Sequence, residues 1–437
     1  MRVLGVGSCC DLGAMYLELV AAGHEVRVFI ADFADSGAMA GMLERVDDWR
    51  AQLPWIEAAG RDGVIVFETA DFGAEQDQLR RDGFQVIGGC TEGDRLEHDR
   101  EYAQTILGEL GLPAPATRTF SDFEQAIAYI EARPGRYVFK LNGSETSSWR
   151  NYVGEAEDGR DLIALLRGQR ARLAAAGATD GLSFVLSDFV SGVEIGTGAF
   201  FNGQRFLEPA CLDWEHKRFF PGDLGELTGE MGTLVSYRDA EPLFSRTLAL
   251  LAPHLRASGY VGYVNLNTIV NEQGIWPLEL TCRFGYPGFA ILAALQLESW
   301  EQLFRKLLDP TSTRFETAPG YAVGVVLTVP PFPYRYGYAE VSKGLPIHFD
   351  PSLTEQERAR LYLGEVARVG DQLVASGTIG YLMVATGVGP QVEDARREAY
   401  ALARRVHVPN LRYRTDIGAR WLEQDRATLQ RLGYLPS

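Results

Sequence analysis

The sequence predicts an α/β protein with α+β character in parts: a parallel-sheet domain at the N-terminus, a central α/β unit and a C-terminal domain with a mixed sheet. Two patterns predict this class. Short apolar runs alternate with helix-sized segments over residues 1–98, which is typical of a buried parallel sheet. Strand and turn patterns then dominate the last quarter of the chain, before two helical segments. A chain of 437 residues has room for about three domains.

Residues 1–98 are predicted to form one Rossmann-like domain. Its strands are expected to be continuous apolar runs, because a parallel sheet is covered on both faces. Gly5, Gly7 and Gly13 lack the tight spacing of a dinucleotide-binding loop, so they do not indicate a dinucleotide. The expected strands are 2–6, 24–30, 63–67 and 84–88, and the first expected helix is 14–22.

Residues 99–315 are predicted to form the central domain, with a lid subdomain at about 118–188. The segment 111–115 contains one glycine and two prolines and interrupts the helical pattern. The glycine- and serine-rich stretch 142–154 is expected to be the mobile part of the lid. The expected helices are 95–110, 121–132, 160–176 and 289–308, and the expected strands are 136–141, 182–189, 193–201 and 261–270.

Residues 316–437 are predicted to form the C-terminal domain. The segment 309–320 is rich in Thr, Pro and Ser, and it is therefore the expected linker to this domain. Helices are expected near its end, at 391–406 and 417–432.

Charge and cysteine content exclude several classes of function. Lys and Arg number 42 against 58 Asp and Glu, a net charge of −16 that opposes a bulk contact with nucleic acid or an anionic membrane. Five cysteines without a CxxC pair do not indicate a disulfide framework, and cytoplasm is the expected location. No uncharged apolar run reaches the ~18 residues of a membrane span, and the N-terminus lacks the pattern of an export signal. Small molecules are therefore the expected partners.

Polar side chains at the ends of expected strands indicate a phosphate site. Lys140 ends an apolar strand before the glycine-rich stretch, and Glu194 follows a tight turn. Glu279, Thr281 and Arg283 alternate along one expected strand and therefore share a face. A carboxylate with a neighbouring oxygen ligand suits a hard divalent cation that bridges phosphates. An arginine two residues further along can contact a phosphoryl oxygen.

Glu279 has apolar neighbours on a strand that is expected to be central. Burying its carboxylate without a cation would be costly, so the residue pattern favours a metal ligand. Arg283 leaves two alternatives open. It contacts a phosphoryl group, or it forms a structural ion pair with Glu279.

Six segments in a fixed order carry a family resemblance. They are EHKR at 215–218, GELTGEMG at 225–232, ELTCRFGYPG at 279–288, GVVLTVPPFPYRYG at 324–337, GTIGYLMVATGVGPQVEDARREAY at 377–400 and YRTDIGARWLE at 413–423. With these segments the chain resembles the ATP-grasp superfamily and, within it, the phosphoribosylamine–glycine ligase family, over nearly its whole length.

The resemblance implies an ATP-grasp fold and an ADP-forming ligase. In this chemistry a carboxylate attacks the γ-phosphate of ATP, and an amine then displaces phosphate from the mixed anhydride. Positioning and charge neutralisation carry most of such a phosphoryl transfer. The implied cofactors are ATP and Mg²⁺ (or Mn²⁺), and the implied partners are a small carboxylate and a small amine. A homodimer is left open.

The resemblance also implies a role for each matching residue. Arg100 and Lys140 match basic residues that contact the nucleotide and its phosphates. Leu186, Ser187, Asp188 and Phe189 match the segment whose backbone contacts adenine, and Glu194 matches the acid that binds the ribose. Glu279 matches a metal ligand, Thr281 stands where the family has an Asn ligand, and Asn267 is the expected substitute. Arg283 matches the arginine that faces the acyl phosphate, and Lys217 and Arg218 match the Lys-Arg pair beside the substrate, so these three are the catalytic candidates.

The sequence departs from the family's pattern where the acceptor substrate is expected. Residues 8–12 read Ser-Cys-Cys-Asp-Leu in place of an Arg-Glu-His triplet, and Asp11 would repel a substrate phosphate. The lid segment 142–150 also differs. We therefore expect a carboxylate–amine ligase whose acceptor is not phosphoribosylamine. The alternatives are phosphoribosylamine–glycine ligase activity and a catalytically silent nucleotide-binding homologue.

Overall fold

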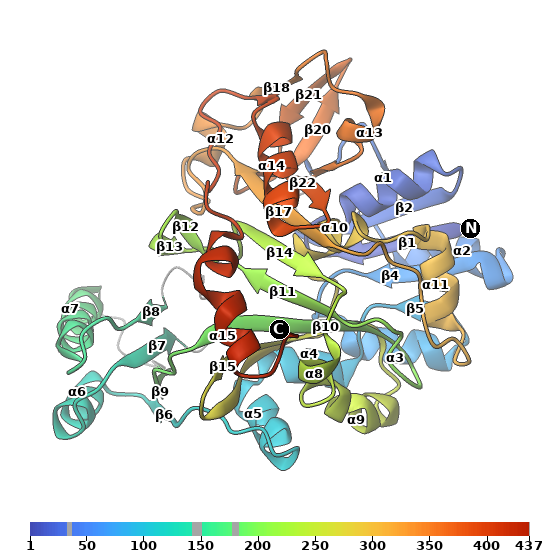
Figure 1. The fold of residues 1–437 in the computed structure, drawn as a ribbon. Helices are drawn as coiled ribbons and strands as arrows, with labels where there is room; N and C mark the ends of the chain where they lie inside the picture. The colour runs from blue at the N-terminus through green and yellow to red at the C-terminus, as the bar shows by residue number, and fades with distance from the viewer. Residues whose placement is uncertain (33–36, 142–150, 177–182, 437) are drawn as a thin grey trace.

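The computed structural model describes residues 1–32, 37–141, 151–176 and 183–436 (Figure 1). Most of the expected mobile stretch, residues 142–150, lies outside the described residues. None of the described helices combines the length and the apolar character that a bilayer span requires.

The N-terminal sheet has five parallel strands in the order β3-β2-β1-β4-β5, as the apolar runs predicted. Alternate residues of β4 belong to two separate cores, with Val64 and Val66 on one face and Ile65 and Phe67 on the other. Both faces are therefore buried. The strands are β1 (Arg2–Gly7), β2 (Glu25–Ile30), β3 (Glu44–Arg45), β4 (Gly63–Phe67) and β5 (Val86–Ile87), and the helices are α1 (Gly13–Ala21), α2 (Leu53–Glu57), α3 (Gly73–Arg81) and α4 (Thr91–His98).

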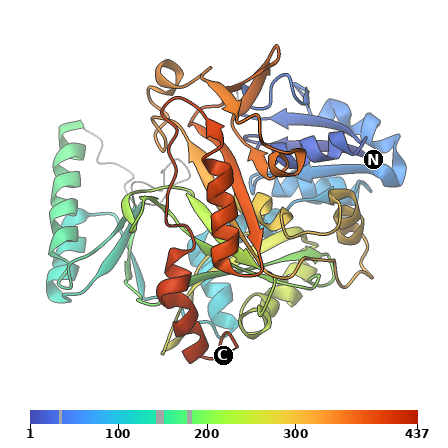
Figure 2. The ribbon, with the colours of Figure 1, turned by 45° about the horizontal axis from the view of Figure 1, so that its top comes forward.

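The lid is a small antiparallel sheet in the order β6-β9-β7-β8, with two helices on one side. It has its own core, in which the ring of Phe184 packs against the rings of Phe120, Phe123 and Phe139. Figures 1 and 2 show this unit projecting from the rest of the molecule. Its elements are β6 (Thr117–Phe120), α6 (Phe123–Ala132), β7 (Tyr137–Leu141), β8 (Tyr152–Val153), α7 (Arg160–Ala176) and β9 (Phe184–Asp188).

An eight-stranded sheet forms the centre of the molecule, in the order β16-β15-β10-β11-β14-β17-β22-β19. The sheet contains strands from both sides of residues 315–316, where the domain boundary is predicted. That boundary stays a prediction. β16, which carries Glu279, pairs only with β15, so it is the edge strand and the expectation of a central strand is wrong. The strands are β10 (Val193–Asn202), β11 (Cys211–Glu215), β14 (Gly232–Ser236), β15 (Val261–Asn271), β16 (Gly274–Thr281), β17 (Tyr321–Thr328), β19 (Leu361–Leu363) and β22 (Tyr381–Gly389).

The remaining elements surround this sheet. Two of them are the hairpin strands β12 (Arg218–Phe220) and β13 (Leu224–Leu227), and four are the small-sheet strands β18 (Pro346–Phe349), β20 (Val366–Val369), β21 (Gln372–Ala375) and β23 (Val406–His407). The helices are α5 (Arg100–Glu109), α8 (Glu241–Phe244), α9 (Ala252–Ala257), α10 (Gly288–Ala293), α11 (Trp300–Leu308), α12 (Tyr338–Val341), α13 (Glu355–Arg358), α14 (Val392–Ala403) and α15 (Arg426–Arg431). Short 3₁₀ turns lie at Arg50–Gln52, Gly60–Asp62 and Leu248–Leu251, and a π-helical turn lies at Trp421–Asp425.

Two expected long helices are each divided in two. Asp99 separates α4 from α5, because its side chain accepts a hydrogen bond from the Tyr102 backbone N–H and starts a new helix. Ser299 starts α11 in the same way, through a capping box with Gln302. The expected linker 309–320 is tied down, since Phe315 is buried and its backbone N–H donates to the Glu208 carbonyl.

Candidate functional site

A cavity of about 430 Å³ lies between the lid and the eight-stranded sheet. The lid contributes residues of β7 and of the end of β9, and the central sheet contributes residues of β10 and β16. The cavity brings together eight of the site residues predicted from the sequence. They are Arg100, Lys140, Ser187, Asp188, Phe189, Glu194, Lys217 and Glu279.

One wall of this cavity is formed by apolar side chains. Sequence reasoning did not identify this wall, because isolated apolar residues on separate elements give no local signal. The side chain of Leu186 points instead into the lid core and is 2% exposed, since neighbouring residues of a strand face opposite sides. The apolar lining residues are Pro115, Val138, Val153, Val190, Leu227, Ile269, Pro277 and Leu278.

The Lys217 ammonium lies at the centre of the polar wall and binds three carboxylates. Its Nζ is 2.9 Å from Glu279 Oε1, 3.1 Å from Glu215 Oε2 and 3.2 Å from Glu194 Oε1. Desolvation lowers the pKa of Lys217, but these three carboxylates outweigh it and raise that pKa well above its usual value. Lys217 in turn lowers the pKa of Glu279. Lys217 also lowers the pKa of Glu194, whereas desolvation raises the pKa of Glu215 despite the same ion pair.

Lys140 is the second cation of the cavity and has a different environment. Its pKa is lowered to about 8, chiefly by desolvation; Glu279 opposes this shift, and the cations Arg100 and Lys217 contribute to it. Three basic groups thus line one cavity. A bound phosphate would relieve their mutual repulsion and favour the charged form of Lys140.

The predicted metal ligands lie on neighbouring strands, with Asn267 of β15 opposite Glu279 of β16. The Asn267 Nδ2 donates to Glu194 at 2.9 Å and to Glu215 at 3.4 Å, so its amide nitrogen faces the carboxylates. Among the described residues no three acid, His or Cys side chains are arranged to hold a metal ion. Glu279 nevertheless has hard oxygen donors and is 43% exposed to the cavity. These donors fit a divalent cation when Lys217 releases them.

Arg283 lies just beyond the end of β16, and its structural partner is Glu97 of α4. The Arg283 Nε lies 3.0 Å from Glu97 Oε1, and the Cys282 backbone N–H donates to Glu97 Oε2 at 2.8 Å. The alternative of an ion pair with Glu279 is therefore wrong. Arg283 and Thr281 line two further cavities, of about 290 and 180 Å³, each of which also includes Glu279.

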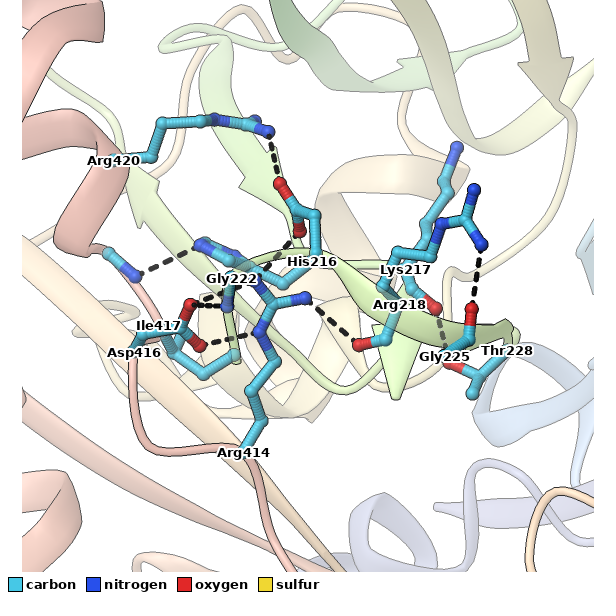
Figure 3. A network of polar contacts seen from close by, with 12 residues as sticks. His216, Lys217, Arg218, Gly222, Gly225, Thr228, Arg414, Asp416, Ile417 and Arg420 are labelled. Atoms are coloured by element: carbon cyan, nitrogen blue, oxygen red, sulfur yellow. Dashed lines mark hydrogen bonds and ion pairs between the residues drawn. The ribbon is translucent and has the colours of Figure 1, made fainter. Parts of the chain in front are cut away.

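The loop that carries Lys217 is fixed by a polar network, shown in Figure 3. Thr228 donates to the Lys217 carbonyl through its N–H and its hydroxyl, which closes the β12–β13 hairpin. Arg218 donates to the Gly225 carbonyl and is not among the residues that line the three cavities. The structure thus places Arg218 in the hairpin, beside the cavity that Lys217 lines.

Residues of the C-terminal segment hold the β12–β13 hairpin in place. Arg414, whose side chain is 2% exposed, pairs with Asp223 and Asp416 and donates to the Arg218 carbonyl at 2.9 Å. His216 Nε2 accepts from the Gly418 backbone N–H at 3.2 Å, and burial lowers the pKa of His216 to about 4. His216 is therefore neutral and structural. The motif at 413–423 pointed to the family, but no local pattern revealed this contact.

The cavity of about 180 Å³ adjoins the larger one, and both are lined by Lys217, Gly229 and Glu279. Its walls add three acids that sequence reasoning missed, Asp213, Glu215 and Glu230. The available signal was the spacing of Asp213, Glu215 and Lys217, which places alternate side chains on one face.

Acidic side chains also surround Tyr286, which lines this smaller cavity. Burial raises the pKa of the Tyr286 hydroxyl well above its usual value, and the charges of Asp11 and Glu365 raise it further. Asp11, in the segment where the sequence departs from the family's pattern, therefore lies near Tyr286. In the same loop the Leu12 N–H donates to the buried Glu68 carboxylate at 3.1 Å.

Comparison with known proteins supports one family along most of the chain. The family model for the phosphoribosylglycinamide synthetase ATP-grasp (A) domain matches residues 98–289, and the model for its C domain matches residues 322–420. Together the two ranges cover more than half of the chain. A phosphoribosylamine–glycine ligase of Vibrio cholerae is 25% identical over 98% of this chain and 100% of its own length. One of Streptococcus suis is 28% identical over 79% of this chain and 80% of its own length.

Solved structures agree with this assignment at the level of the fold. The phosphoribosylamine–glycine ligase of Thermotoga maritima has a TM-score of 0.70 at 23% identity, covering 95% of this chain and 100% of that one. A biotin carboxylase of Campylobacter jejuni has a TM-score of 0.61 at 12% identity, covering 94% and 92%. The chain belongs to the phosphoribosylglycinamide synthetase family of ATP-grasp ligases.

Proposed function

We propose that this protein joins a small carboxylate to a small amine, through an acyl phosphate made from ATP. The observation that carries the proposal is the meeting of Arg100, Lys140, Lys217 and Glu279 in one cavity between the lid and the central sheet. Basic groups and a carboxylate in this arrangement bind a triphosphate and orient its terminal phosphate. The smaller cavity beside Lys217 and Glu279 then receives the molecule to be activated.

The reaction has two balanced steps. A carboxylate oxygen of the first substrate bonds to the γ-phosphorus as the bond to the β-phosphate oxygen breaks, which releases ADP. The nitrogen of the neutral amine then attacks the acyl carbon, the carbon–oxygen bond to phosphate breaks, and the nitrogen loses a proton. In this reaction Lys140 and Arg100 neutralise phosphate charge, and Arg283 faces the acyl phosphate.

A divalent cation, Mg²⁺ or Mn²⁺, is the implied cofactor of this site. The residues that would hold it are Glu279, with Thr281 or Asn267 as the neighbouring ligand. When bound, the cation would neutralise charge on the β- and γ-phosphates. The Lys217 ammonium pairs with the Glu279 carboxylate at 2.9 Å, so cation binding requires this ion pair to rearrange.

The amine acceptor has two candidates. The relatives are named phosphoribosylamine–glycine ligases, which favours phosphoribosylamine and glycine as substrates. The acidic surroundings of Tyr286 favour an acceptor without a phosphate. One feature in this region supports the second candidate: the backbone N–H groups of Ile379, Gly380 and Tyr381 all donate to the Glu365 carboxylate. The N–H groups of this turn are suited to an anion, and the Glu365 carboxylate already accepts hydrogen bonds from them.

An assay of ADP release separates these candidates. Purified protein is incubated with ATP, Mg²⁺ and either phosphoribosylamine with glycine or a panel of other amines and carboxylates. We expect ADP release that requires both a carboxylate and an amine. Turnover with phosphoribosylamine and glycine identifies the named activity, and turnover only with another pair identifies a different acceptor. ATP binding without turnover for any pair would support the catalytically silent homologue. The homodimer and the cytoplasmic location stay predictions.

A further inference from the structure

The cavity of about 180 Å³ has more carboxyl groups in its lining than its own cations pair with. Asp213, Glu215, Glu230 and Glu279 line it together with Lys217 and Arg283. Lys217 pairs with Glu215 and Glu279, and Arg283 pairs with Glu97, which lies outside this cavity. Among the described residues neither Asp213 nor Glu230 forms an ion pair.

Three oxygen atoms in this lining lack any hydrogen-bond partner among the described residues. They are Asp213 Oδ1, Glu230 Oε1 and Thr233 Oγ1. The three residues are only 5%, 6% and 2% exposed. The other Asp213 oxygen accepts from Asn265 Nδ2 at 2.6 Å, so the side chain is held in place. A buried carboxylate oxygen without a donor is costly, and a bound ligand would remove that cost.

The chemistry of these acceptors defines the ligand. Two carboxylates and one hydroxyl offer three acceptors, and a primary ammonium group has three N–H donors. The described residues contain no group of acid, His or Cys side chains suited to a metal ion, so an organic cation fits better. Val235, Leu292 and the bare backbone of Gly288 supply an apolar surface for a short carbon body. A volume of about 180 Å³ limits this body to a small molecule.

We propose that Asp213, Glu230 and Thr233 form a subsite for the primary ammonium group of a small substrate. This inference rests on the proposed ligase function, because the subsite shares Lys217 and Glu279 with the nucleotide cavity. The ammonium comes from one of two sources. It is the α-ammonium of an amino acid whose carboxylate is activated, or the second ammonium of a diamine whose first amine is acylated.

Isothermal titration calorimetry tests the subsite without requiring turnover. The full-length protein with Mg²⁺ and a non-hydrolysable ATP analogue is titrated with glycine and with 1,3-diaminopropane. Glycolate and 1,3-propanediol, in which hydroxyls replace the amino groups, are the comparisons without an ammonium group. We expect at least one of the amines to bind ten times more tightly than its hydroxyl counterpart, and the one that does identifies the source. Binding of both amines no tighter than that of their hydroxyl counterparts would overturn the inference.

Asp213→Asn and Glu230→Gln test the two carboxylates separately. Each is expected to weaken binding of the amine tenfold or more. Each is also expected to raise the melting temperature of the ligand-free protein, because it removes an unpaired buried carboxyl group. A purely structural role would lower the melting temperature instead. Glu272→Gln, at an exposed carboxylate paired with Arg431 in the β15–β16 turn, is the control and should change neither quantity.

The outcomes separate the subsite from the ligase function. Amine binding that depends on Asp213 and Glu230, without ADP release for any substrate pair, would support the subsite and contradict the ligase. ADP release together with amine binding that neither substitution weakens would support the ligase and overturn the subsite. If one variant fails to fold, the other still gives the binding comparison.

Discussion

The Lys217 ammonium lies among three carboxylates, and this arrangement sets the charge balance of the proposed nucleotide site. The ammonium lies within 3.2 Å of Glu194, Glu215 and Glu279. In an ion pair beside a cavity, a cation that binds the carboxylate more tightly can replace the ammonium, because no carboxylate is then left unpaired. Nucleotide and metal binding are therefore expected to move Lys217 from Glu279 towards the phosphates.

Glu279→Ala is expected to abolish turnover while nucleotide affinity falls by less than tenfold. The basic residues Arg100 and Lys140 would still bind phosphates, whereas the proposed metal ligand would be lost. ADP release and calorimetric titration with ATP measure the two effects. Activity equal to that of the unmodified protein would remove Glu279 from the metal site.

Glu68 predicts a particular dependence of stability on pH. Its side chain is 2% exposed, and burial is the main cause that raises its pKa from 4.5 to about 8. Because the folded state holds this proton more tightly than the unfolded state, stability falls as the pH rises from about 4.5 to about 8. Glu68→Gln, which keeps an acceptor for the Leu12 N–H, should raise the melting temperature at pH 8.5 by about 2–4 °C.

The same substitution should have almost no effect at about pH 3.5, well below the unfolded-state pKa of 4.5, because Glu68 is then protonated in both states. Differential scanning fluorimetry across this pH range provides the measurement. A stabilisation that does not vary with pH would show that the effect comes from packing rather than from the carboxyl proton.

At the level of elements, the β12–β13 hairpin depends on a segment almost 200 residues further along the chain. Arg414 pairs with Asp223 in the hairpin loop and donates to the Arg218 carbonyl. The hairpin carries Lys217 at its start, so a displacement there moves the central cation of the site. Arg414 is thus a positioning residue for Lys217.

Arg414→Gln should destabilise the protein by about 2 kcal/mol, since it removes a buried guanidinium and its charge-assisted hydrogen bonds to Asp223, Asp416 and the Arg218 carbonyl. A misplaced Lys217 should also lower kcat about tenfold or more, with a smaller change in the KM for ATP. Thermal unfolding and steady-state kinetics test both effects. Arg431→Gln removes an exposed ion pair with Glu272 and is the matched control, with an expected change below about 0.5 kcal/mol. An unchanged kcat in Arg414→Gln would refute the positioning role.

Elements with a strong local pattern could be predicted from the sequence. The apolar run Gly63–Phe67 forms β4 with the expected bounds, and residues 160–176 form α7 as expected. Helix breaks were missed at Asp99 and Ser299, although both residues are good N-caps. Each N-cap residue lies within a continuous helical pattern, and that pattern predicts one unbroken helix.

Contacts between distant segments could not be predicted in this way. Arg283 pairs with Glu97, and no periodicity connects these two positions. No periodicity connects Asp213 and Glu230 either. These residues are distant in the sequence and line one cavity only in the folded protein. The ordered motifs named residues that line one cavity, because the family resemblance supplied the distant contacts that local patterns do not contain. Their role in nucleotide binding stays a prediction.

At the scale of the whole molecule, the lid is a separately packed unit beside a large continuous core. The lid core contains Phe184 and its aromatic neighbours, whereas the main core extends from the N-terminal sheet to the C-terminal helices. The cavity of about 430 Å³ takes residues from both units. A nucleotide bound there, as proposed, would contact two units with separate cores, and its binding would favour closure of the lid.

Hydrogen–deuterium exchange should report this coupling. A non-hydrolysable ATP analogue with Mg²⁺ is expected to slow exchange in β7 and β9 of the lid and in β16 of the central sheet at the same time. Each of these strands contributes lining residues to the cavity. Protection confined to one side would contradict binding between the two units.

The most direct test of the account is a crystal structure of the protein with Mg²⁺ and a non-hydrolysable ATP analogue. The account predicts the triphosphate between the lid and the eight-stranded sheet, with Lys140 on a phosphate oxygen and the Glu279 carboxylate on the cation. A nucleotide bound elsewhere, or a Glu279 carboxylate still paired with Lys217 and distant from the cation, would contradict it.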